Sequence, residues 1–321
     1  MLERVLIKNF RALQSVEVAL KPITALIGSN DTGKTSFLHA LGVLGNCFGL
    51  SVTDCFRLGT NSVVIEGWTQ GGGAHGGIVY DPRQTPGVRD RDSVADVRTA
   101  ISPTNYFRLS IDGVPTQERG IPEAHGTPML QPNGSGLAPL FDYLLRRDRD
   151  RFELIQQAAR EHVPGLREIL IATPDADTRR IDLAVERDLL LPAASASTGV
   201  RLILFFIGLV YHPKPPKLIL LEEPETGVHP KRLKDIMALL RAISTGKYGA
   251  YPAQVVLTTH SPYLLDSMTL DSDQVLVFKR EADGNRTAHA VDVEGINVFL
   301  DEFKLGEVWY NEGEDGLVRK K

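Results

Sequence analysis

The chain carries the sequence ITALIGSNDTGKTS at residues 23–36. The apolar run at its start predicts a short buried strand, and the residues that follow form the pattern G-x4-G-K-T. Gly28 and Gly33 let the backbone turn tightly and bring its N–H groups against phosphate oxygens. Lys34 then offers a cation for the β- and γ-phosphates, and the Thr35 hydroxyl offers a ligand for Mg²⁺. The stretch therefore predicts a phosphate-binding loop of a nucleotide-binding protein.

The residues after this loop support the same interpretation. Residues 36–41 have helical character, so the N-terminus of a helix would face the bound anion. The competing interpretation is a plain Gly/Ser/Thr turn with one exposed lysine. A strand before the loop and a helix after it both disfavour that alternative.

Length and composition limit the class of protein. The chain has 321 residues, of which 42% are hydrophobic and 24% charged, enough for one large or two small domains. A net charge of −4 gives no overall basic field for nucleic acid, although a local patch stays open. The two cysteines are too few for a disulfide framework. No secretory signal opens the chain, and its longest apolar run, residues 202–211, is about half a membrane span. We therefore expect a cytoplasmic protein that does not enter a membrane.

The middle of the chain differs from its two ends. Residues 50–135 contain short β-like runs separated by Gly/Pro-rich joints, which predict an antiparallel β subdomain. Apolar residues at spacings of three and four then predict helices over 134–147 and 151–162. The mixed charge run at residues 146–151 has two interpretations, a solvated helix face and a contact to the DNA backbone. The solvated face is the default.

Acidic residues and a histidine follow two further apolar runs. Glu222 and Glu223 come directly after the predicted strand 217–221, where carboxylates are costly unless they meet a cation or a reacting group. One could reach Mg²⁺ through water, and the other could orient an attacking water at a γ-phosphate. His260 follows the predicted strand 254–259 and could sense that γ-phosphate. A solvated acidic turn and a structural histidine are the alternatives.

In this order, the pieces resemble the ATP-binding-cassette (ABC) ATPases, and within them the branch of OLD (overcoming lysogenization defect) nucleases, RecF and SMC proteins. The opening LIKNFR at residues 6–11 and Asn30 in the phosphate loop are similar to that branch. EEPETGVHP at residues 222–230 looks like its Walker B and D-loop segment, and TTHSP at residues 258–262 looks like its H-loop. The resemblance covers most of the chain.

The resemblance implies one α/β head of the P-loop NTPase, ABC-ATPase type. Its central sheet would be mixed or parallel, with an antiparallel β subdomain and a helical lobe. The core lobe would include residues 1–50 and 200–290, the inserted β subdomain and helical lobe residues 51–199, and the C-terminal tail residues 291–321.

ATP and Mg²⁺ are the cofactors that the resemblance implies. Thr35 and Glu222 would hold Mg²⁺, Glu223 would polarise the lytic water, and His260 would contact the γ-phosphate. The residues expected around the phosphates are Gly28, Asn30, Asp31, Thr32, Gly33, Lys34, Thr35 and Ser36.

A second loop would act across a dimer. Ser197 and Gly199 match the signature loop, which in this family binds the nucleotide of the opposite protomer. Two ATP molecules would then lie between two heads, and the active unit would be a homodimer.

Three departures from the family pattern stand out. The signature sequence, ASTGV at residues 196–200, lacks the leading leucine and the polar residue after the glycine. Glu222 replaces the commoner aspartate, although its extra methylene still permits a contact to Mg²⁺ through water. No glutamine is a clear Q-loop residue among Gln70, Gln117 and Gln131.

These features favour an OLD/RecF-like ATPase that acts as a dimeric nucleotide switch. We expect it to control a separately encoded effector, a nuclease by analogy with OLD proteins, in anti-phage defence or DNA maintenance, since we find no space for a Toprim nuclease domain or coiled-coil arms. The alternative is a RecF-like clamp that binds DNA and uses ATP to time loading and release. A transporter ATPase is a weaker choice, and no Asn-Lys-x-Asp motif supports a GTPase.

In the tail, Trp309 and Tyr310 could dock a partner or pack on the chain's own head.

Overall fold

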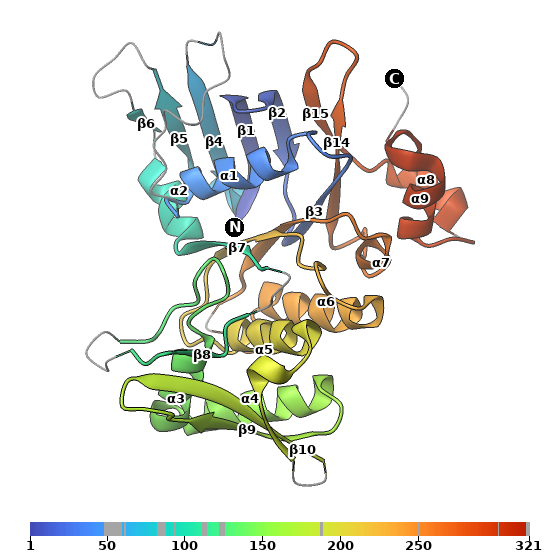
Figure 1. Cartoon of the computed structure of the whole chain (residues 1–321). Coiled ribbons are helices and arrows are strands. Elements are labelled where there is room, and N and C mark those ends of the chain that lie inside the picture. Colours follow the sequence, from blue (N-terminus) through green and yellow to red (C-terminus); the bar gives the residue numbers. More distant parts are fainter. Residues whose placement is uncertain are drawn as a thin grey trace. The chain divides into compact units, whose positions relative to one another are not determined.

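The computed structural model describes residues 1–47, 60, 62–81, 88–92, 94–110, 114–121, 126–186, 189–249, 251–300 and 302–318 (Figure 1). The chain forms two compact units, which we describe separately. Unit 1 contains Met1–Tyr106, Pro216–Pro224 and Ala253–Lys321, and unit 2 contains Phe107–Pro215 and Glu225–Pro252.

Unit 1 holds two sheets and five helices among the described residues. Its strands are β1 (Leu2–Phe10), β2 (Leu13–Ala19), β3 (Ile23–Ile27), β4 (Val63–Thr69), β5 (His75–Tyr80), β6 (Val88–Asp92), β12 (Leu218–Glu222), β13 (Gln254–Thr258), β14 (Gln274–Arg280) and β15 (Arg286–Ala290). Strand β7 (Thr104–Arg108) begins in unit 1 and ends in unit 2. The helices are α1 (Lys34–Leu44), α2 (Val94–Ile101), α7 (Pro262–Leu265), α8 (Val293–Leu300) and α9 (Leu305–Gly316), with one 3₁₀ turn at Gln70–Gly72.

The six-stranded sheet has the order β15-β14-β3-β13-β12-β7. Strand β3 pairs in parallel with both β13 and β14, and β13 pairs in parallel with β12. All five residues of each of β3, β12 and β13 are buried, as their mainly apolar sequences predict for parallel strands covered on both faces. The expected α/β fold with a mixed central sheet is confirmed.

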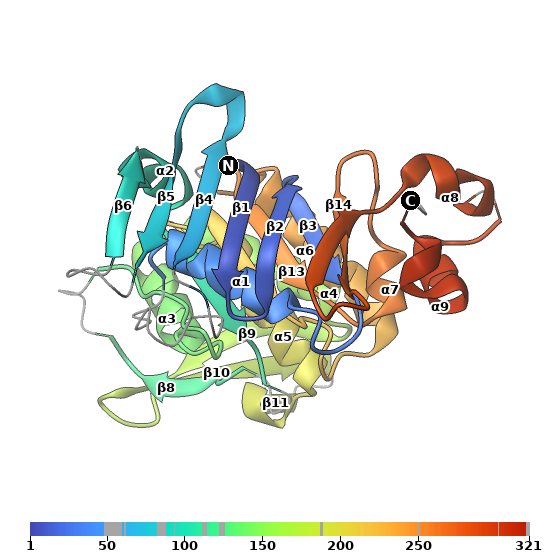
Figure 2. The same ribbon diagram turned by 90° about the horizontal axis from the view of Figure 1, so that it is seen from above.

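The second sheet is antiparallel and has the order β2-β1-β4-β5-β6 (Figure 2). Strand β1 pairs with β2 on one side and with β4 on the other. The sequence predicts an antiparallel subdomain inside an insert over residues 51–199, whereas this sheet also contains the N-terminal strands β1 and β2. The compact units therefore divide the chain at different residues, because β4 hydrogen-bonds to β1 and stays with unit 1.

One apolar core joins the two sheets of unit 1. Helix α1 contributes Phe37 and Leu41, the antiparallel sheet contributes Val5 and Ile65, and the six-stranded sheet contributes Phe278. The rings of Phe37 and Phe278 meet edge to face, with centroids 5.5 Å apart. The core therefore fixes α1, and with it the loop that precedes it, against the six-stranded sheet.

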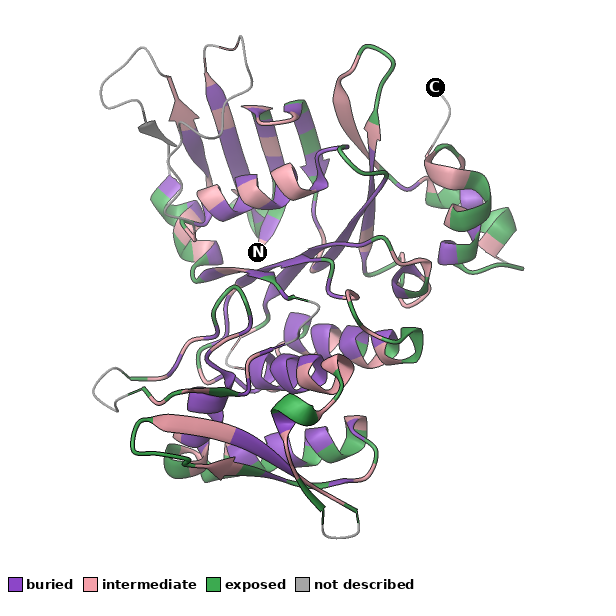
Figure 3. Ribbon diagram, viewed as in Figure 1, coloured by how far each residue is buried: buried purple, intermediate pink, exposed green. Residues whose placement is uncertain are grey.

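Unit 2 is built around a buried helix. Its helices are α3 (Leu137–Arg147), α4 (Arg149–His162), α5 (Thr198–Val210) and α6 (Pro230–Ser244). Helices α3 and α4 lie close to the helices predicted over residues 134–147 and 151–162. Residues 202–210 of α5 are all buried, which is why this run is apolar on every side (Figure 3). Strands β8 (Gln117–Arg119), β9 (Leu166–Ala172), β10 (Thr178–Val185) and β11 (Leu189–Pro192) form a sheet, and a 3₁₀ turn covers Ala193–Ser195.

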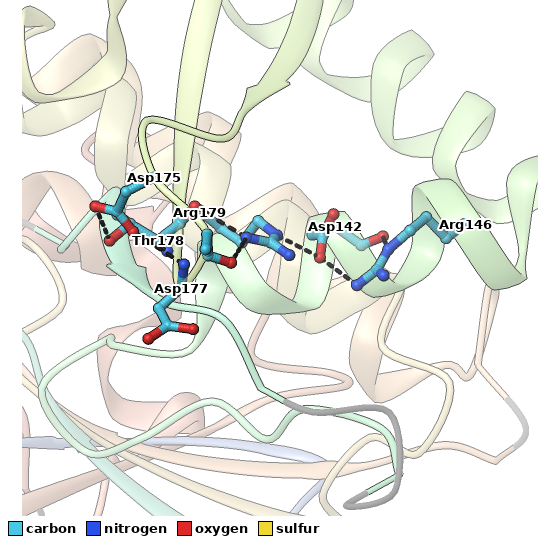
Figure 4. A network of polar contacts seen from close by, with 7 residues as sticks. Asp142, Arg146, Asp175, Asp177, Thr178 and Arg179 are labelled. Carbon is cyan, nitrogen blue, oxygen red and sulfur yellow. Dashed lines mark hydrogen bonds and ion pairs between the residues drawn. The ribbon is translucent and has the colours of Figure 1, made fainter.

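Polar contacts fasten α3 to β10 within unit 2 (Figure 4). The carboxylate of Asp142 on α3 pairs with Arg146 one turn later and with the Arg179 Nε of β10, at 3.0 Å for the latter. Asp175 closes the turn before β10 by accepting hydrogen bonds from the backbone and hydroxyl of Thr178. The network explains why an acidic residue is tolerated on the buried side of α3.

The C-terminal tail forms α8 and α9. Trp309 is half-buried, whereas Tyr310 is 80% exposed. Only one member of the expected aromatic pair thus packs within the chain. Within the described part of the chain, no helix has both the length and the apolar content needed to cross a membrane.

A buried glutamine ties the two sheets of unit 1 together. Gln254, at the start of β13, is 1% exposed. Its Oε1 accepts from the Leu2 backbone N–H at 2.8 Å, and its Nε2 donates to the Leu2 carbonyl at 2.8 Å and the Lys21 carbonyl at 3.2 Å. One side chain therefore satisfies the backbone at the start of β1 and before β3.

We predict that Gln254→Leu lowers the free energy of unfolding by about 2 to 4 kcal/mol, because it leaves buried backbone groups without partners. Urea denaturation measures the change. Gln14→Leu is the matched control, since Gln14 is exposed on β2 of the same unit and should alter stability by less than about 0.5 kcal/mol. Equal effects of the two substitutions would contradict the assigned role.

Candidate nucleotide-binding site

The loop between β3 and α1 needs its two glycines. Gly28 has φ +133°, and a Cβ there would come within 2.2 Å of the Phe278 carbonyl oxygen. Gly33 has φ +101°, and a Cβ there would lie 2.6 Å from Leu13 Cδ2. Both the backbone angle and the packing therefore exclude a side chain, which holds the loop close to its neighbouring strands.

Lys34 is folded over this loop. It is 7% exposed, and its Nζ donates to the carbonyl oxygens of Gly28 at 2.6 Å and Ser29 at 2.8 Å. Burial lowers the pKa of Lys34, while the carboxylates of Glu223 and Glu314 act in the opposite direction. The amine thus lies against the backbone of the loop, where a bound polyphosphate would replace these carbonyl partners.

Thr35 and Glu222 form the candidate Mg²⁺ site. The Thr35 hydroxyl donates to Glu222 Oε1 at 2.8 Å, and Glu222 is 8% exposed at the end of β12. A hydroxyl and a buried carboxylate are hard oxygen donors of the kind that Mg²⁺ prefers, and a buried carboxylate is stabilised by a cation. The residues present therefore fit the metal, with Thr35 as ligand and Glu222 as a direct or water-mediated partner.

Glu223 and His260 face each other beside that site. His260 Nε2 lies 3.7 Å from Glu223 Oε1. Glu223 adopts φ +46°, a left-handed conformation uncommon for a residue with a side chain, and its N–H is held by Thr258 Oγ1 at 3.1 Å. Burial and the charge of Lys34 lower the pKa of His260 despite the nearby carboxylates, so the imidazole is neutral near pH 7. Both residues line a pocket of about 190 Å³ with the phosphate-binding loop.

The remaining loop residues take different positions. Asn30 and Ser36 line the 190 Å³ pocket, and the Thr32 hydroxyl donates to a backbone carbonyl of the loop at 2.8 Å. Asp31, at φ +62°, pairs instead with Arg286 of β15 at 2.9 Å. Asp31 also lines the 190 Å³ pocket, and its ion pair connects the loop to β15.

The signature residues lie in unit 2. Ser197 is the N-cap of α5, and its hydroxyl accepts from the Val200 N–H at 3.3 Å. Gly199 lies in the first turn of α5, where an added Cβ would meet only Ser197 Oγ, at 4.0 Å. The fold of unit 2 thus gives no steric reason for glycine at this position.

The structure adds two residues that sequence reasoning missed. The hydroxyl of Tyr106, on β7, donates a hydrogen bond to Glu222 Oε2. Glu314 of α9 accepts from the Ser29 hydroxyl at 3.0 Å. A neutral aromatic residue in a strand and an acidic residue in the tail carry no local signal of such contacts.

The described residues offer no rival centre. They contain no group of three or more His, Cys, Asp or Glu side chains that could hold a metal ion. Burial raises the pKa of the Cys47 thiol to about 12, which removes it as a nucleophile, and Cys55 lies outside the described residues. The loop site of unit 1 is therefore the candidate functional site.

Sequence comparisons point to the same class of protein. Residues 1–62 match the family described as "AAA ATPase domain", and residues 115–266 match "AAA domain, putative AbiEii toxin, Type IV TA system". An OLD nuclease of Thermus scotoductus is 47% identical over 47 residues, 14% of this chain and 9% of that protein. The DNA replication and repair protein RecF of Klebsiella pneumoniae is 32% identical over 113 residues, 34% of this chain and 29% of that protein. The matched segments thus span less than a third of either relative.

Solved structures support the fold. The SMC head domain from Thermotoga maritima aligns with a TM-score of 0.57 at 14% identity, covering 91% of this chain and 99% of that one. An Smc head bound to the C-winged helix domain of ScpA aligns with a TM-score of 0.60 at 16% identity, covering 91% and 98%. Together with the order of the motifs and the site that they build, these matches support an ABC-type ATPase of the OLD/RecF/SMC branch.

Proposed function

We propose that this chain binds and hydrolyses Mg-ATP and works as a dimeric nucleotide switch that controls a separately encoded effector. The observation that carries the proposal is the convergence of Lys34, the Thr35–Glu222 pair and the Glu223–His260 pair within one unit. These are a phosphate cation, a metal-binding pair and a pair suited to orienting water beside a γ-phosphate.

Each residue has one task in the proposed reaction. Mg²⁺ supplies charge neutralisation at the β- and γ-phosphates when it is bound. Lys34 leaves its backbone partners to bind the same phosphates, and Thr35 and Glu222 hold the metal. Glu223 accepts a hydrogen bond from the attacking water, and the neutral imidazole of His260 donates its one N–H to the γ-phosphate.

The signature loop supports the dimer. Glycine in a helical turn costs stability relative to alanine, and neither backbone angle nor packing requires it at position 199. A close approach by the nucleotide of a second protomer would account for Gly199. The N-terminus of α5, capped by Ser197, would then point its backbone N–H groups at an anion.

The role of the switch is proposed from the relatives. The relatives are a nuclease and a replication and repair protein, and the family matched by residues 115–266 is described by a toxin of a toxin–antitoxin system. These names favour anti-phage defence or DNA maintenance, with an effector, such as a nuclease, activated by the nucleotide state.

A RecF-like DNA clamp is the second candidate. For this function, the charge run at residues 146–151 would be a contact to the DNA backbone. Arg146 pairs with Asp142, and Arg151 pairs with Asp148 and donates to the Tyr211 carbonyl. Because these arginines have partners within unit 2, the effector-controlling switch is the better-supported function.

Glu223→Gln should retain Mg-ATP, slow its hydrolysis and accumulate the dimer, because the amide cannot accept the proton of the attacking water. Light scattering with and without Mg-ATP measures the mass, and phosphate release measures turnover, expected to fall at least about 100-fold.

Lys34→Ala/Glu223→Gln is the control, since without the lysine the phosphates lose their cation and the chain should stay monomeric. If Glu223→Gln hydrolyses ATP at the wild-type rate, a residue other than Glu223 orients the attacking water. A mass that does not respond to Mg-ATP would contradict the switch.

Glu314→Gln should tighten ATP binding about threefold to tenfold at low ionic strength. The Glu314 carboxylate lies on the phosphate-binding loop, where it opposes a bound triphosphate by like-charge repulsion. The effect should shrink in high salt. Fluorescence titration with a labelled ATP measures it, and Glu312→Gln, an exposed carboxylate on the same helix, is the matched control. Weaker binding by Glu314→Gln would show that this carboxylate assists the nucleotide.

A further inference from the structure

The carboxylate of Glu222 is held at both oxygens. Oε1 accepts from Thr35 Oγ1 at 2.8 Å, and Oε2 accepts from the Tyr106 hydroxyl. Thr35 belongs to the phosphate-binding loop, whereas Tyr106 comes from β7, the strand beside β12 in the six-stranded sheet. Two elements far apart in the sequence thus converge on one carboxylate, which is 8% exposed.

The direction of the Tyr106 hydroxyl is itself fixed. The Tyr106 ring lies against the His39 ring of α1, with centroids 5.2 Å apart. His39 Nδ1 in turn contacts an Arg11 guanidinium nitrogen. The ring is therefore anchored by its strand, by α1 and by the turn after β1, so its hydroxyl can orient a flexible partner.

Glutamate needs such a partner more than aspartate does. Its side chain has one methylene more than that of aspartate, which adds a rotatable bond. A carboxylate with one anchor could turn about that bond, while a second anchor on the other oxygen leaves one orientation. The Thr35 hydroxyl can donate to Oε1 and still offer a lone pair to a cation, so both anchors are compatible with a bound metal.

We propose that Tyr106 is a positioning residue of the Mg²⁺ site: its hydroxyl fixes Glu222 so that Oε1 faces Thr35 and the metal. Tyr106 acts through Glu222 and touches neither metal nor phosphate. The proposal rests on the Mg-ATP site proposed above and adds to it a residue that lies outside the sequence motifs of that site.

Tyr106→Phe tests the hydroxyl without removing the ring. The readout is equilibrium binding of a fluorescent ATP analogue as a function of Mg²⁺ concentration, with no turnover required. The Mg²⁺ concentration for half-maximal effect should rise about tenfold, as expected for losing a hydrogen bond to a carboxylate. Affinity measured in EDTA should stay within about twofold, because the phosphate-binding loop is untouched. Tyr310→Phe, at an exposed tyrosine of the tail, is the matched control.

Testing Tyr106→Phe in a Glu222→Asp variant distinguishes the positioning of the Glu222 carboxylate from a general packing effect of Tyr106. The shorter carboxylate cannot keep both the Thr35 and the Tyr106 contacts, so adding Tyr106→Phe should change the Mg²⁺ dependence by less than about twofold. An equal shift in both backgrounds, no shift in either, or an equal loss of affinity in EDTA would overturn the proposal.

A second measurement needs neither nucleotide nor metal. Tyr106→Phe and Glu222→Gln should be coupled by about tenfold in the unfolding equilibrium constant, taken from the single and double variants. Additive effects would overturn the proposal. A wild-type chain that bound no ATP would contradict the proposed function, and the coupling would still decide whether Tyr106 holds Glu222.

Discussion

The register of three parallel strands is the constraint on which the site depends. Leu26 of β3 pairs with Thr258 of β13, and Thr258 pairs with Glu222 of β12, so one row crosses the sheet at the strand ends. The phosphate-binding loop, Glu223 and His260 each begin within two residues of that row. A shift of one strand by a single residue would move its functional group by about 3.3 Å and dissolve the Thr35–Glu222 and Glu223–His260 pairs.

Packing holds this register. The buried strands β3, β12 and β13 have no polar face that would permit slippage, and Gln254 fixes β13 to the chain at Leu2 and Lys21. Helix α1 is fixed in the shared core by Phe37, so the loop between β3 and α1 is held at both ends. The site is therefore held where the strands end, and its polar groups lie at the end of β12, in the first turn of α1 and in the turns after β12 and β13.

Much of this arrangement follows from local sequence. The G-x4-G-K-T pattern, the acidic pair after one apolar run and the histidine after another are each read within ten residues, and the rule that ligands bind at the carboxyl ends of parallel strands brings them together. The pairing of β1 with β4 could not be predicted in this way, because no short-range signal selects a strand about 60 residues away. The contact between Tyr106 and Glu222 could not be predicted for the same reason, because it depends on β7 lying beside β12.

The dimer joins these parts in the proposed mechanism. The groups proposed to hold ATP lie in unit 1, Ser197 and Gly199 lie in unit 2, and β7 begins in one unit and ends in the other. If each nucleotide is completed by the signature loop of the opposite protomer, every site contains residues of two chains. The ATP-binding residues can then be mutated in one chain and the signature loop in another, and mixing the two variants should restore an intact site.

Mixing Lys34→Ala with Gly199→Gln and following ATP hydrolysis tests this claim most directly. Gly199→Gln is tolerated by the free chain, because the position is open, yet it would block a nucleotide brought by a partner. The account predicts that neither variant hydrolyses ATP alone and that the mixture does, since a hybrid dimer contains one intact site. A mixture that stays inactive, or a Gly199→Gln variant that is fully active alone, would contradict a site shared between two protomers.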